Sequence, residues 1–271
     1  MKTHVNGVNI AYDDQGQGQG MGPPIVFLHA FPLNRTMWAT QAAALSRQFR
    51  TISIDLRGLG ESDAPYWRYS MEHYVRDVKD VLAYLGVENA LFVGLSLGGY
   101  LEFALYRAHP TLMRGLVLAD TRAEADTPAQ IQWRFNLAQR TAAEGPSAVI
   151  AEMLPKLLAP ARYDRDPDLV AKVRALLQAA PVPGIIGALM AIAERADSTD
   201  LLPAITVPTL VIVGADDVLT TRADAERMAK RIRSAELVVI PDAGHLSNLE
   251  QPDQFTAAVE RFAKKVSLPA R

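Results

Sequence analysis

The run ALFVGLSLGGY, residues 90–100, decides the fold. Ala90–Leu95 is a continuous apolar run, which is typical of a buried strand, and a helix is expected to follow over Gly98–Ala108. Between them, Gly94-Leu95-Ser96-Leu97-Gly98 is a G-x-S-x-G sequence in the strand–turn–helix setting that this motif requires. A sharp turn brings the residues two before and two after the serine close together, so both must be small. The pattern predicts that Ser96 is a nucleophile held above the end of a sheet.

Apolar strands and amphipathic helices alternate outward on both sides of this run. Seven more strands are expected, at Lys2–Val5, Val8–Tyr12, Pro24–His29, Thr51–Leu56, Arg114–Ala119, Thr209–Val213 and Glu236–Ile240. Further helices are expected at Met37–Gln48 with Thr36 as its N-cap, Ser70–Leu85, Arg222–Ile232 and Pro252–Val266. The first two strands form an edge hairpin turned at Asn6-Gly7. The rhythm predicts an α/β fold with a mostly parallel eight-stranded sheet covered on both faces.

The rhythm is interrupted after the sixth expected strand. From Arg122 to about Ile205 no strand is predicted, and proline residues separate four expected helices, at about Pro128–Ala143, Pro146–Leu158, Asp166–Ala179 and Pro183–Arg195. The simplest organisation is a single α/β core, residues 1–121 and 206–271, that carries a helical cap at residues 122–205.

Composition narrows the possible functions. The chain has 271 residues and a formal net charge of −2, which argues against a nucleic acid or an anionic membrane surface as partner. With no cysteine, disulfides, thiolate catalysis and cysteine-bound zinc are excluded. The N-terminus lacks the apolar segment of a signal peptide, so a soluble, cytoplasmic protein is expected. The glycines within Gln15–Pro24 do not match a dinucleotide-binding fingerprint, and this segment is expected to be a surface loop.

A serine nucleophile needs a neighbouring base, because its hydroxyl is weakly nucleophilic at neutral pH. The chain has five histidines. His245 follows the last expected strand, and the carboxyl ends of parallel strands are where such sheets assemble their sites. His29 also ends a strand, but the loop that follows it is expected to supply a backbone amide to the site instead. His245 is therefore the predicted base.

The base in turn needs a carboxylate that fixes its tautomer. The expected strand Thr209–Val213 is followed by two adjacent aspartates, Asp216 and Asp217, whose side chains cannot point the same way in extended backbone. Asp120, at the end of Arg114–Ala119, is a third candidate. All three aspartates lie between Ser96 and His245, so each of them fits the chain order Ser, Asp, His.

Backbone amides should receive the negative charge that develops during acyl transfer. One is expected from Leu97, the residue after the nucleophile, and the other from Phe31, in the loop after Pro24–His29. The Phe31 ring is also a candidate for lining the substrate pocket. Trp133, among the apolar residues of the expected cap, is a second candidate for that lining.

Five segments together resemble the α/β-hydrolases with a four-helix cap: HAFPL (29–33), DLRGLGESD (55–63), GLSLGGY (94–100), GADD (214–217) and GHLSNLEQP (244–252). The resemblance covers nearly the whole chain, and it implies the α/β-hydrolase fold. The G-x-x-D spacing of the family pattern implies that Asp217 is the acid. Ala30 stands where glycine is usual, and Leu97 where methionine is common, but neither change removes a backbone amide.

The resemblance extends to bacterial carboxylesterases, cofactor-free haloperoxidases (perhydrolases) and 3-oxoadipate enol-lactonases. It implies a serine carboxylic-ester hydrolase that works through an acyl-enzyme, on a small-molecule ester or lactone, without cofactor or metal. Serine rather than aspartate at position 96 argues against haloalkane dehalogenases and epoxide hydrolases. An enol-lactone hydrolase, a perhydrolase and a non-catalytic small-molecule receptor are the alternatives.

Overall fold

A computed structural model describes residues 1–16 and 22–267 of the chain. Its centre is an eight-stranded sheet with the strand order β1-β2-β4-β3-β5-β6-β7-β8. The strands are β1 (Lys2–Val5), β2 (Val8–Gln15), β3 (Ile25–Leu28), β4 (Thr51–Ile54), β5 (Ala90–Leu95), β6 (Met113–Ala119), β7 (Thr209–Gly214) and β8 (Ala235–Ile240). Among the described strands only the pairs β1–β2 and β2–β4 are antiparallel, which confirms the mostly parallel sheet and its edge hairpin. Residues 17–21, the middle of the expected Gly/Gln-rich loop, lie outside the described residues.

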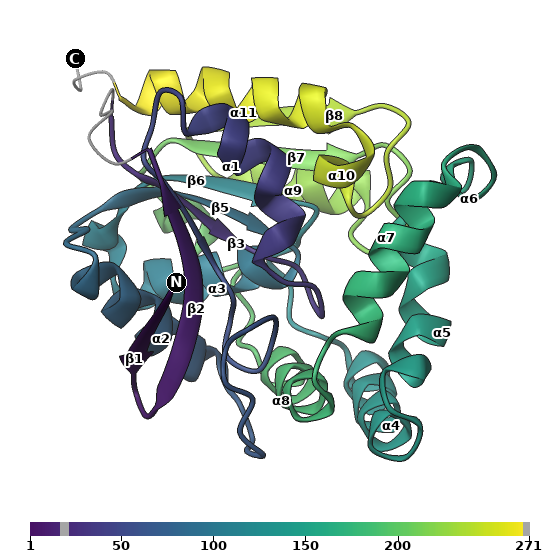
Figure 1. The fold of residues 1–271 in the computed structure, drawn as a ribbon. Helices are drawn as coiled ribbons and strands as arrows, with labels where there is room; N and C mark the ends of the chain where they lie inside the picture. The colour runs from purple at the N-terminus through teal and green to yellow at the C-terminus, as the bar shows by residue number, and fades with distance from the viewer. Residues whose placement is uncertain (17–21, 268–271) are drawn as a thin grey trace.

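Helices cover both faces of the sheet (Figure 1). On one face, α1 (Ala39–Leu45) packs against α11 (Pro252–Val266), and on the other α2 (Met71–Tyr84) packs against α3 (Leu97–Ala108). α9 (Arg222–Arg231) packs against β7 and β8. Every residue of β3, β4 and β5 is buried, as the apolar runs in their sequences predict for strands covered on two sides.

The expected helix at Met37–Gln48 begins differently. A short 3₁₀ helix, Arg35–Trp38, precedes α1, and its N-cap is Asn34, whose side chain accepts a hydrogen bond from the Thr36 amide at 3.0 Å. The prediction of Thr36 as the N-cap was therefore wrong, because asparagine two residues earlier satisfies the free amide of the first turn. Ser70, at the start of α2, does cap its helix through the His73 amide.

Five α-helices and a short 3₁₀ helix (Leu202–Ala204) lie between β6 and β7, the α-helices being α4 (Pro128–Glu144), α5 (Pro146–Leu157), α6 (Arg162–Arg165), α7 (Pro167–Gln178) and α8 (Val182–Ala193). Four of them were expected, whereas α6 is a single turn, too short to produce a periodic apolar pattern. They stand to one side of the sheet, toward the carboxyl ends of its parallel strands (Figure 1). We call this helical insertion the cap. Its limits at residues 122 and 205 stay a prediction.

No single helix among the described residues is long and apolar enough to cross a membrane. The pair α7 and α8 passes that test only jointly, and a bend of 92° separates the two helices.

One buried acid stands out in the core. Glu102 on α3 is 0% exposed, and neither oxygen of its carboxyl group has a hydrogen-bond partner among the described residues. Burial raises the pKa of Glu102 well above its usual range, and the nearby Gly94 backbone offsets only part of this effect. The folded protein therefore keeps a proton that the unfolded chain releases above about pH 4.3.

We expect the substitution Glu102→Gln to stabilise the protein increasingly as pH rises. A carboxyl whose pKa is higher in the folded state costs stability between its unfolded and folded pKa values, by up to about 1.4 kcal/mol per pH unit. Urea unfolding of the variant and the wild type at about pH 5 and pH 8 should show a gap that widens at the higher pH. The exposed control Glu88→Gln should show no such widening. An equal gap at both pH values would mean that Glu102 is ionised in the fold.

Candidate active site

Ser96 lies in the turn between β5 and α3, with φ 55° and ψ −106°, a conformation that residues other than glycine rarely adopt. Neighbouring strands hold it there. Its amide donates to the Ala119 carbonyl at the end of β6 at 3.0 Å, and its carbonyl accepts from the Thr121 hydroxyl at 2.9 Å. Ser96 is the one residue of Ala90–Tyr100 that is not fully buried, so the turn exposes the serine while its flanks stay packed.

The two glycines around Ser96 are needed for different contacts. A Cβ on Gly94 would lie 2.4 Å from the Gly98 carbonyl carbon, which is the close approach that the motif predicts. A Cβ on Gly98 would instead lie 2.2 Å from the carbonyl oxygen of Leu28, the last residue of β3. The second glycine therefore lets the turn sit directly against the strand that leads into the Phe31 loop.

His245 and Asp217 lie in contact. The Nδ1 atom of His245 is 2.9 Å from Oδ2 of Asp217, and both side chains are almost fully buried. Asp217 also accepts hydrogen bonds from the Leu219 and Thr220 amides at 2.8 and 3.1 Å, and from the Thr220 hydroxyl at 2.6 Å. These donors fix the carboxylate in one orientation toward the imidazole.

The charges of this pair support each other. Burial opposes ionisation of Asp217, but the neighbouring His245 and the donors around the carboxylate hold its pKa below the usual value. Burial likewise opposes protonation of His245, but the Asp217 carboxylate, with smaller contributions from Asp120 and Glu250, raises its pKa above the usual value. The site is therefore arranged to stabilise an imidazolium.

The other two acid candidates lie elsewhere. Asp216 is exposed, and its side chain has no hydrogen-bond partner within the described part of the chain. Asp120 is buried and accepts from the Gly214 amide at 2.8 Å and from the Ser247 hydroxyl. Burial and the charge of Asp217 raise the pKa of Asp120 well above its usual range. Asp120 thus links the end of β7 to the loop of His245 without contacting the imidazole by a hydrogen bond.

The loop of His245 is also fastened to the cap. Glu250, in α10 (Ser247–Glu250), accepts hydrogen bonds from the Gly244 amide at 2.7 Å and the Ala159 amide of the cap at 2.8 Å. Burial raises the pKa of Glu250 to about 7. α10 is another single turn that the sequence pattern did not predict, and it places Glu250 where it bridges the core and the cap.

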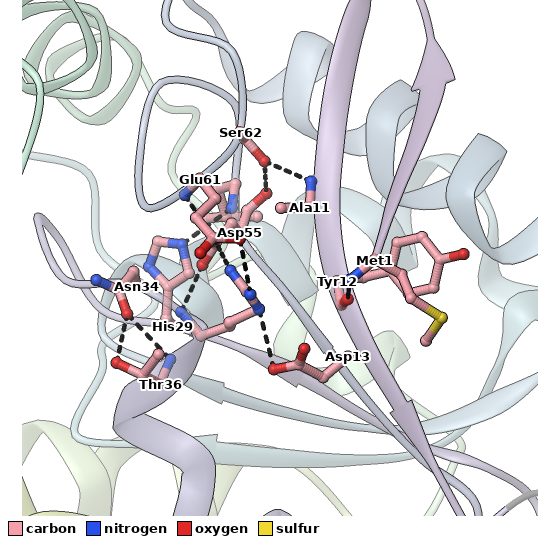
Figure 2. Close-up of polar contacts among 12 residues, drawn as sticks. Met1, Ala11, Tyr12, Asp13, His29, Asn34, Thr36, Asp55, Glu61 and Ser62 are labelled. Carbon is pink, nitrogen blue, oxygen red and sulfur yellow. Dashed lines mark hydrogen bonds and ion pairs between the residues drawn. The ribbon is translucent and has the colours of Figure 1, made fainter.

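The loop after β3 is held by His29. Its Nε2 accepts from the Leu56 amide and its Nδ1 donates to the Ala30 carbonyl, both at 2.9 Å. Burial lowers the pKa of His29, which keeps the ring neutral as this pair of contacts requires. Both ring nitrogens of His29 are therefore hydrogen-bonded to backbone groups, so this histidine holds the loop in place. Figure 2 shows His29 beside Asp55 in this junction.

An ion-pair network around the buried Asp55 also holds the same loop. Asp55 accepts from the Arg35 and Glu61 amides at 2.7 and 2.8 Å and pairs with the Arg35 guanidinium, which also binds Asp13 of β2 at 2.9 Å (Figure 2). The network joins the N-terminal hairpin to the loop that carries Phe31.

Two backbone amides next to the candidate site residues have no hydrogen-bond partner in the described part of the structure. The Phe31 and Leu97 amides donate no hydrogen bond to any described residue. For Leu97 the reason is local, since it is the first residue of α3 and the first amides of a helix have no partner within it. The helix dipole adds partial positive charge at the same place.

A cavity of about 210 Å³ lies between the core and the cap. Ser96, His245 and Phe31 line it from the core, and Trp133 and Met153 line it from the cap. Residues on the wall that the sequence analysis missed are Tyr100, Arg122, Gln130, Arg134, Lys156, Ile192, Leu219 and Thr220. Most of them carry no motif. Tyr100 ends the GLSLGGY segment, and Thr220 has a local signal, since a hydroxyl three residues after an aspartate is typical of a turn.

Comparison with known proteins gives consistent matches over almost the full length. A family model described as alpha/beta hydrolase fold matches residues 23–252. The chain is 31% identical over 252 residues to 3-oxoadipate enol-lactonase 1 of Acinetobacter baylyi, covering 93% of this chain and 92% of that protein. A thermophilic esterase from Thermogutta terrifontis matches with a TM-score of 0.93 and 39% identity, covering 98% of this chain and 97% of the other. The enol-lactonase from Burkholderia xenovorans matches with a TM-score of 0.90 and 33% identity, covering 97% and 99%.

Proposed function

Since this chain belongs to the α/β hydrolase fold family, we propose that it is a serine hydrolase that cleaves carboxylic esters of small molecules through an acyl-enzyme. The observation that carries the proposal is the contact between His245 and Asp217 at the wall of the cavity that Ser96 also lines. Three separate strand-end loops bring these residues together, in the chain order that the fold uses for such sites.

In the proposed reaction, Asp217 holds the Nδ1 side of His245, which leaves Nε2 to accept the proton of the Ser96 hydroxyl. The Ser96 oxygen attacks the ester carbonyl, and the negative charge that forms on the carbonyl oxygen is received by the Phe31 and Leu97 amides. His245 then passes its proton to the departing alcohol. Water, activated by His245, hydrolyses the acyl-Ser96 ester and releases the acid.

Lactone hydrolysis is the second candidate function. Similarity to the enol-lactonases of Acinetobacter baylyi and Burkholderia xenovorans supports it, at 31% and 33% identity. A lactone is a cyclic ester, so the same proposed residues would open it, and the alcohol would remain attached to the acid. Perhydrolysis would use the same acyl-enzyme, with hydrogen peroxide in place of water.

A substrate panel separates these possibilities. The cavity of about 210 Å³ is smaller than the roughly 300–1000 Å³ usual for drug-sized ligands, so we expect short acyl chains to be preferred. The kcat/KM for p-nitrophenyl butyrate should exceed that for the octanoate by about tenfold, a difference of about 1.4 kcal/mol. The same panel should include an enol-lactone, and acetate with hydrogen peroxide. Turnover of the lactone without turnover of any ester would replace the esterase proposal, and peracid formation would favour the perhydrolase.

A further inference from the structure

The catalytic cavity has a charge imbalance that ester hydrolysis alone does not require. Its wall includes three cationic side chains, Arg122, Arg134 and Lys156, and none of the described residues that line it carries a carboxylate. Arg134 and Lys156 come from α4 and α5 of the cap, and Arg122 from the chain that leads into the cap. The core supplies the proposed reacting groups, and the cap side supplies the positive charge.

A single buried carboxylate cannot neutralise these cations. Asp126, whose side chain is fully buried, pairs with Arg122 at 2.7 Å, with Arg195 at 2.8 Å and with Arg134. Three guanidinium groups thus pair directly with one carboxylate, while Asp197 and Asp224 act on Arg195 and Arg122 from farther away. The Arg195 group also lies 4.1 Å from the centre of the Tyr100 ring. Among the directly paired groups positive charges outnumber negative ones, and partial burial strengthens their field beside the cavity.

Hydrogen-bonding capacity remains unused in the same place. The Nε atom of Arg122 is buried and has no partner among the described residues, and the side chain is only 15% exposed. That nitrogen has almost no accessible surface, so a ligand would meet the exposed end of the Arg122 guanidinium rather than Nε. The ammonium group of Lys156 is 3.9 Å from its nearest carboxylate, Glu152, and it lies 5.8 Å from the centre of the Trp133 ring. Lys156 can therefore turn toward an anion in the cavity at little cost.

We propose that this cavity selects esters or lactones that carry a free carboxylate, held by Arg122, Arg134 and Lys156 while the reacting carbonyl lies at Ser96. The inference rests on the proposed function for the reacting end only. The carboxylate is the anion of choice because guanidinium groups bind it with two parallel hydrogen bonds. Trp133, between Arg134 and Lys156, would pack against the chain that joins the two ends of the substrate.

The test uses two substrates that differ in one group. Mono-p-nitrophenyl glutarate and p-nitrophenyl pentanoate have acyl chains of the same length, ending in a carboxylate and a methyl group. The wild type should favour the glutarate in kcat/KM by about tenfold or more, as one charge-assisted hydrogen bond would give. Raising sodium chloride from about 0.05 M to about 0.5 M should reduce this preference, because salt screens charges that are partly exposed.

Variants identify the groups responsible. Lys156→Gln and Arg134→Gln should each reduce the glutarate-to-pentanoate ratio by about tenfold, and Lys156→Arg should restore it. The matched control Lys172→Gln removes an exposed charge from α7 of the cap and should leave the ratio unchanged. Because each ratio is measured on one protein sample, partial unfolding of a variant affects both substrates equally and cancels.

Failure of the inference can be told from failure of the proposed function. Equal turnover of the two esters, or an equal loss of ratio in Lys172→Gln, would overturn carboxylate selection while ester hydrolysis stands. If neither ester is hydrolysed, the proposed function fails, and calorimetric titration of glutarate into the protein then decides on the anion site. Binding that weakens in Lys156→Gln would support the site, and no binding would overturn it.

Discussion

Replacing Ser96 by alanine should lower kcat for p-nitrophenyl butyrate by about 10⁴- to 10⁶-fold, the range seen when a serine nucleophile is removed from a site of this kind. No acyl-enzyme can form without the hydroxyl, so only binding and the two amides would remain to assist water. The turn itself should persist, because its backbone contacts to Ala119 and Thr121 do not involve the side chain. Activity and melting temperature, measured on the same sample, check both statements.

One outcome would clearly contradict this prediction. If Ser96→Ala retained activity within about tenfold of the wild type, the nucleophile would be another residue and the proposed mechanism would be lost. Ser234→Ala, which removes an exposed hydroxyl at a distance from the cavity, is the matched control and should behave as the wild type. A fluorophosphonate probe should label the wild type at Ser96 and leave the alanine variant unlabelled.

Replacing Asp217 by asparagine should lower kcat by about 10⁴-fold while leaving the fold intact. The amide nitrogen can donate to Nδ1 of His245, which favours the tautomer with its proton on the wrong nitrogen. The variant also removes the charge that raises the pKa of His245 against the effect of burial. His245 must be neutral to accept the serine proton, so the acid limb of the kcat/KM profile should move to lower pH in the variant.

A pH profile therefore distinguishes this role from simple damage. The wild type should lose activity as pH falls through the raised pKa of His245, which lies above the ordinary value of about 6.5. An unchanged acid limb in Asp217→Asn would show that Asp217 does not control the imidazole. Asp216→Asn alters the exposed neighbour and should leave both kcat and the profile unchanged.

The elements of the core could be predicted from sequence because each carries its own local pattern. Ala90–Leu95 and Pro252–Val266 have the predicted bounds, since a buried strand and a strongly amphipathic helix are marked by apolar spacing alone. The wrong N-cap at Thr36 and the missed single-turn helices α6 and α10 are the expected failures. Their ends depend on one hydrogen bond or on packing against distant segments.

Part of the candidate site could likewise be predicted from the sequence, and part could not. Ser96, His245 and the pair of adjacent aspartates follow strands, so their place at one edge of the sheet could be inferred, and the contact of Asp217 with His245 agrees with the choice made from family spacing. The charge cluster could not be inferred. Arg195 meets Asp126 from 69 residues away, and no local pattern in the sequence pairs them.

The place of the cap in the sheet has a consequence for how such proteins diversify. The chain leaves the sheet at the end of β6 and, before it turns back to begin the neighbouring strand β7, the Ser198 amide donates to the Ala123 carbonyl at 2.9 Å. Both ends of the insertion are therefore anchored side by side on a frame that does not depend on what lies between them. Helices of the cap can be lengthened, exchanged or given different charges without a change in the register of the strands. Selection on substrate preference can thus act on α4–α8 while the proposed reacting groups stay in place.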